Sequence, residues 1–175
     1  MIWIWLCWCA FCAALLEVIL GNHGVPMPLL AMVTFYFTAT LGWKAVFIPL
    51  VVAGTILDLL LARTFPTALL LLPAIMAMAH WWKSHGDCKS VPTQALPGVA
   101  LGVVIGLGRV MLESWTTEKW GLGLLGKSAW LVFLFALAGA VVTPLLFRLL
   151  DRAAVALSFT PYRTIQDTVA DPSAG

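Results

Sequence analysis

The chain has 175 residues, of which 62% are hydrophobic and only 10% are charged, and its formal net charge is +2. A soluble domain of ordinary composition carries about 25% charged residues. The composition therefore leaves too little hydrophilic sequence for a catalytic domain outside the membrane, and the small charge gives no indication of nucleic-acid binding.

Long uncharged segments dominate the sequence. No Asp, Glu, Lys or Arg occurs in residues 18–43, 64–82, 90–108 and 128–147. Apolar runs of about 18 residues or more can cross a bilayer as helices. We therefore predict an all-α integral membrane protein with six transmembrane helices in a compact bundle. The predicted helices cover residues 2–20, 25–42, 44–62, 67–82, 97–113 and 128–150.

The predicted domain organisation is simple. Residues 1–150 form one polytopic transmembrane domain, and residues 151–175 form a disordered cytoplasmic tail. The N-terminus is apolar from its first residues and lacks the basic region of a signal peptide, which favours a retained first helix. Cys7, Cys9 and Cys12 in that helix do not share one face at 100° per residue, so we expect small buried thiols and no metal site.

The connections between the predicted helices are tight, as expected for antiparallel neighbours in a bundle. Turn-forming Gly and Pro residues occur in residues 21–28, 42–44 and 63–66. With the N-terminus inside, the inner loops hold more Lys and Arg than the outer loops, so both termini are predicted to be cytoplasmic. The inner set is Lys44, Lys83, Lys89, Arg148, Arg152 and Arg163, and the outer set is Arg63, Lys119 and Lys127. Trp43, Trp81, Trp82, Trp115 and Trp120 fall near predicted helix ends, as interfacial anchors do.

Ionisable residues within the predicted spans are the candidate site. Glu17, Asp58, Arg109 and Glu113 all lie in the outer halves of their helices. Charges at that depth need a partner or water, so we predict an intramembrane polar cluster in which Asp58 or Glu17 pairs with Arg109. The cluster serves either as helix-to-helix pairing or as a shallow site for a ligand or partner helix.

A second feature is a row of small residues on the fifth predicted helix. Gly98, Gly102 and Gly106 recur every four residues and form one face that permits close approach of another helix. That face serves internal packing or, alternatively, an external partner. The sequence contains no nucleophile elbow, phosphate loop or paired-carboxylate motif, so we predict no catalytic, cofactor-binding or metal-binding residues and no enzyme activity.

Two stretches, PLLAMVTFY at residues 28–36 and GTILDLL at residues 54–60, carry a resemblance to a known family. They resemble the MreD family, the small membrane component of the bacterial rod-shape machinery. Residues 28–36, which read PLLAMVTFY, resemble the proline-initiated second helix of that family. Residues 54–60, which read GTILDLL, resemble its Gly-x-x-x-Asp-Leu third helix and place Asp58 on the motif. The resemblance covers about residues 15–82, although residues 62–66 replace a turn that is usually glycine-rich.

The resemblance implies a non-enzymatic scaffold in the bacterial inner membrane. Its direct partner would be a bitopic MreC-like protein, and its indirect partners would be MreB and RodA with its transpeptidase. The scaffold would help to organise lateral peptidoglycan synthesis and rod cell shape. The lipid bilayer is a further expected partner. No nucleic acid or cofactor is expected to bind.

A transport function is the main alternative. Substrate-binding S-components of energy-coupling-factor vitamin importers are similar in size and six-helix layout, and the MreD fold is thought to be similar to theirs. Ala10 and Ala14 resemble the small-residue motif of their first helix. The outer polar residues would then bind a vitamin. A membrane enzyme is a third class. It would need convergent polar residues, and only Glu17, Asp58, Arg109 and Glu113 qualify.

Overall fold

The computed structural model describes residues 2–23, 27–61, 66–85, 91–117, 122–157 and Tyr162. The side chains of residues 67–69, 91–94, 112–117 and 122–128 lie outside this description. The six helices are α1 (Ile2–Asn22), α2 (Leu29–Leu41), α3 (Trp43–Leu60), α4 (Thr67–His85), α5 (Val91–Thr117) and α6 (Leu122–Ala156). The predicted all-α fold with six helices is confirmed.

Three of the described helical segments are long and apolar enough to cross a membrane, namely Ile2–Asn22, Trp43–Leu60 and Ala129–Ala156. Their apolar side chains also face outward to an extent that water would not favour. Ile4 and Leu59 are each 74% exposed, and Ile48 is 71% exposed. Lipid is the solvent that covers such faces without a free-energy penalty, so the helices indicate a membrane protein.

Helix α2 lies at the centre of the fold. It has 13 residues and is about 20 Å long, shorter than the roughly 30 Å hydrocarbon core of a bilayer. Ten of its 13 residues are buried, so protein and not lipid surrounds it. The helix ends at Gly42, whose φ of 84° lies in the left-handed region that glycine adopts without strain.

Helices α5 and α6 are much longer than their predicted spans. They contain 27 and 35 residues, which correspond to about 40 Å and 50 Å. Hydropathy marks the part of a helix that lipid covers, whereas backbone hydrogen bonding continues into the polar residues beyond it. The sequence-based boundaries at residues 97, 113 and 128 were therefore too narrow. The predicted tail from Asp151 is likewise helical up to Ala156.

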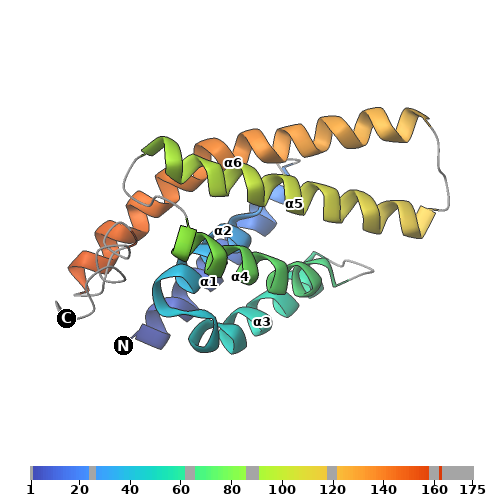
Figure 1. Cartoon of the computed structure of the whole chain (residues 1–175). Coiled ribbons are helices and arrows are strands. Elements are labelled where there is room, and N and C mark those ends of the chain that lie inside the picture. The colour runs from blue at the N-terminus through green and yellow to red at the C-terminus, as the bar shows by residue number, and fades with distance from the viewer. Residues whose placement is uncertain are drawn as a thin grey trace.

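Helices α5 and α6 form a hairpin that extends beyond α1–α4 (Figure 1). Figure 1 also shows α6 bending along its length, and α6 contains Pro144, which removes one backbone hydrogen bond and favours a bend. The start of α1 and the end of α6 lie at the same side of the molecule in this view. That this side is cytoplasmic stays a prediction.

Candidate functional site

Glu17 of α1 is the residue around which the candidate site is built. Its side chain is buried, with 7% of the residue exposed, and its Oε2 accepts a hydrogen bond of 3.2 Å from the backbone N–H of Leu30. Leu30 lies in the first turn of α2, whose N-cap residue, Pro28, makes no side-chain capping bond. The first N–H groups of a helix have no partner within it and carry partial positive charge. Glu17 thus caps α2 from a neighbouring helix.

Arg109 of α5 approaches the same carboxylate. Its Nη2 lies 3.9 Å from Oε1 of Glu17, and its guanidinium carbon lies 5.1 Å from the ring centroid of Phe135 on α6. The face of an aromatic ring attracts a cation. Arg109 therefore links α1 to the α5–α6 hairpin, and Glu17 links both to the start of α2.

The other two members of the predicted cluster have different outcomes. Asp58 is on α3 and is buried, with 6% of the residue exposed. The predicted pairing of Arg109 with Glu17 is present in the structure. Glu113 lies four residues after Arg109 on α5, and its side chain is outside the described part of the chain.

A cavity of about 40 Å³ adjoins Glu17 and Arg109. A buried water needs about 10–15 Å³ of such volume, so the cavity has room for a very few water molecules. Apart from the ion pair, its lining is apolar and includes Leu30, Leu72 and Ile105. The arrangement can fix helices relative to one another and can hold water beside a buried charge.

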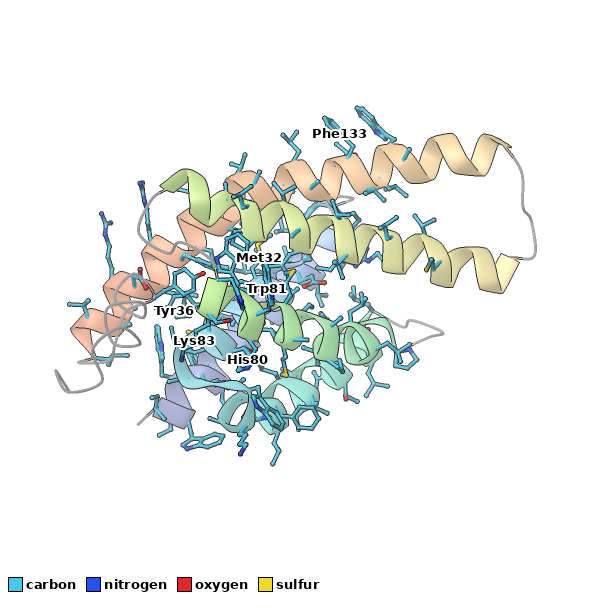
Figure 2. All side chains as sticks on the ribbon, viewed as in Figure 1. Met32, Tyr36, His80, Trp81, Lys83 and Phe133 are labelled. Carbon is cyan, nitrogen blue, oxygen red and sulfur yellow. The ribbon has the colours of Figure 1, made fainter. Side chains whose placement is uncertain are left out.

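A third buried carboxylate, after Glu17 and Asp58, was not among the predicted site residues. Asp151 of α6, the first residue of the predicted cytoplasmic tail, is only 7% exposed. Its Oδ1 accepts hydrogen bonds from the Tyr36 hydroxyl at 2.8 Å and from the Tyr162 backbone N–H at 2.7 Å. Figure 2 shows Tyr36 beside the C-terminal half of α6.

Helical periodicity was the signal that could have found Asp151. The buried residues Phe147 and Ala154 lie four positions before it and three positions after it, and such residues share a helix face. Arg148 and Arg152 in the same segment are exposed. A count of charged residues near the helix end did not distinguish the buried Asp151 from the exposed Arg148 and Arg152.

Gly98, Gly102 and Gly106 of α5 face α6 and not an open surface. A Cβ atom added to Gly98 would meet the backbone of Gly139, and one added to Gly102 would meet the backbone of Phe135. A Cβ at Gly106 would lie 3.0 Å from the Cα of Val132. Since α6 already covers this face, an external partner does not reach it in this arrangement.

The cysteines of α1 differ in their exposure. Cys7 is exposed and Cys9 is buried. Within the part of the chain that the structure describes, no group of three or more His, Cys, Asp or Glu side chains could hold a metal ion.

Exposed aromatic side chains lie near two helix ends, where the sequence predicted interfacial anchors. Trp43 at the start of α3 is 49% exposed, with the Lys44 Nζ 5.9 Å from its ring centroid. Near the end of α4, Trp81 is 56% exposed and its ring stacks on His85 at 5.1 Å. Figure 2 shows His80, Trp81 and Lys83 together in this region. Half-exposed indole rings next to basic groups are typical of the interface between lipid and water.

Comparison with known proteins adds no relative. No protein-family model, curated protein or solved structure matches the chain. The function must therefore be argued from the residues and their geometry.

Proposed function

We propose that this chain is a non-enzymatic membrane scaffold of the bacterial elongation machinery, similar to MreD, which binds a bitopic MreC-like protein in the inner membrane. The observation that carries the proposal is the burial of Asp58 in an apolar helix. Asp58 is 6% exposed, and Gly54, one turn before it on the resembling motif, is also buried. Acidic residues inside membrane helices are costly and are retained mainly for function.

The position of the resembling segments supports the same proposal. The stretch 28–36 covers most of α2, the central buried helix, and the stretch 54–60 ends α3. Both stretches are therefore part of the region that organises the fold. Apolar faces of α1, α3 and α6 surround it and are available to other membrane helices or to lipid, as the exposure of Trp8, Ile48 and Leu145 illustrates.

The vitamin-importer alternative has less support. Sites for small organic ligands usually measure about 300–1,000 Å³ and contain several convergent polar groups. The cavity beside Glu17 and Arg109 measures about 40 Å³. Larger hollows of about 250 and 320 Å³ lie elsewhere and are lined almost entirely by apolar side chains.

The test is capture of the tagged protein in a mild detergent followed by mass spectrometry. We expect a bitopic MreC-like protein together with wall synthases. Recovery of a pair of transporter ATPases with a large coupling protein would instead overturn the scaffold proposal and favour a vitamin importer.

Two isosteric variants sharpen this test. Asp58→Asn neutralises the carboxylate on the MreD-like motif, and Glu17→Gln neutralises a buried carboxylate outside the two matched stretches. We expect Asp58→Asn to lower partner recovery about tenfold and Glu17→Gln to leave it near the wild-type level, at equal protein levels. Equal recovery with both variants would contradict a specific role for Asp58.

A further inference from the structure

Tyr162 lies beyond the end of α6 and is buried. Helix α6 ends at Ala156, yet Tyr162 is 0% exposed. Its ring centroid lies 4.9 Å from that of Phe147 on α6 and 5.9 Å from that of Tyr36 on α2. An aromatic ring buried against two others is a strong apolar contact.

Polar contacts fix the same residue. The Tyr162 backbone N–H donates to Oδ1 of Asp151 over 2.7 Å, and the Tyr36 hydroxyl donates to the same oxygen over 2.8 Å. Hydrogen bonds to an ionised carboxylate are about twice as strong as neutral ones. One oxygen atom of Asp151 thus accepts hydrogen bonds from both Tyr36 of α2 and Tyr162.

We propose that Tyr162 is a latch that packs onto Phe147, Tyr36 and Asp151 and thereby holds α6 against α2. With the latch closed, Asp151 is covered. With the latch open, a carboxylate and two aromatic rings become accessible at this end of α6. This inference does not depend on the proposed function.

Proteolysis of the full-length protein in a mild detergent tests the latch. Trypsin binds an extended segment on both sides of its cleavage site, so cleavage after Arg163 requires Tyr162 to leave its buried position. Cleavage after Arg152 requires α6 itself to open. Burial and hydrogen bonding of the backbone decide such rates, and intact-mass spectrometry follows both cleavages in one sample.

Two variants make the result specific. Tyr162→Ala removes the ring and should speed cleavage after Arg163 about tenfold while the rate after Arg152 stays unchanged. Tyr162→Phe keeps the ring and the N–H donor and should behave as the wild type. An unchanged rate in Tyr162→Ala would overturn the latch. Equal acceleration at both sites would also overturn it, since Tyr162 would then be an ordinary part of the core.

Hydrogen exchange tests the second half of the proposal. Amides of α2 around Tyr36 and of α6 around Asp151 should exchange faster in Tyr162→Ala than in Tyr162→Phe. Faster tail cleavage with unchanged exchange in both helices would show that Tyr162 does not hold α6 against α2.

Discussion

The contacts within the α5–α6 hairpin differ in kind from the contacts between the hairpin and α1–α4. Within the hairpin, glycines bring backbone against backbone, as at Gly98 with Gly139. Between the hairpin and α1–α4, side chains make the contacts, including the Glu17–Arg109 ion pair and the Tyr36–Asp151 hydrogen bond. Backbone contacts leave no room for adjustment, whereas side-chain contacts can open and re-form. We therefore expect the hairpin to behave as a rigid unit on an adjustable attachment.

The largest effect is expected inside the hairpin. Gly102→Ala places a Cβ atom against the backbone of Phe135, which cannot move as a side chain could. Overpacking of this kind costs about 3 kcal/mol of unfolding free energy. Unfolding in a denaturing detergent measures it.

A matched glycine on α1 provides the control for that variant. A Cβ at Gly21 would meet nothing closer than a Leu61 side-chain atom at 3.8 Å, which is ordinary contact. Gly21→Ala should therefore leave stability unchanged or raise it slightly, because alanine favours helix. Equal destabilisation by both variants would contradict the backbone-contact account.

A smaller effect is expected at the Asp151 end of the attachment. Asp151→Ala leaves the Tyr36 hydroxyl and the Tyr162 N–H without their shared acceptor, and we expect a loss of about 2 kcal/mol. Asp151→Asn keeps an acceptor oxygen and should lose less. Thermal unfolding of the three proteins measures the order, and an alanine variant as stable as the wild type would show that the buried carboxylate contributes nothing.

The smallest effect is expected at the Glu17 end, and it should be asymmetric. The Glu17 side chain is 8% exposed and that of Arg109 is 33% exposed. Arg109→Gln removes the cation near a buried charge and should cost about 1.5 kcal/mol. Glu17→Gln removes the charge from the buried partner, keeps an acceptor for the Leu30 N–H and should cost about half as much. The reverse order in thermal unfolding would mean that the ion pair is not the main interaction of Glu17.

The sequence was sufficient for the helices and for part of the site. Apolar runs separated by Gly and Pro predicted all six helices, because lipid requires continuous backbone hydrogen bonding. The same reasoning singled out Glu17 and Arg109 as charges within spans. It also singled out the glycine face of α5, while leaving open what that face contacts.

The remaining features depend on contacts between distant parts of the chain. Tyr36 and Asp151 are separated by 115 positions, and no local pattern pairs them. The capping of α2 by Glu17 requires the packing of α1 against α2, which hydropathy does not specify. The ends of α5 and α6 lie outside the segments that hydropathy selected, where apolar content no longer indicates a helix.

The central claim is that the α5–α6 hairpin is rigid while its attachment to α1–α4 is adjustable. Hydrogen exchange of the Glu17→Gln, Asp151→Asn double variant tests this claim most directly. We expect faster exchange in α2, with protection of α5 and α6 around Gly98–Gly106 and Gly139 unchanged. Uniformly faster exchange through all six helices would contradict the account, because the hairpin and its attachment would then be one cooperative unit.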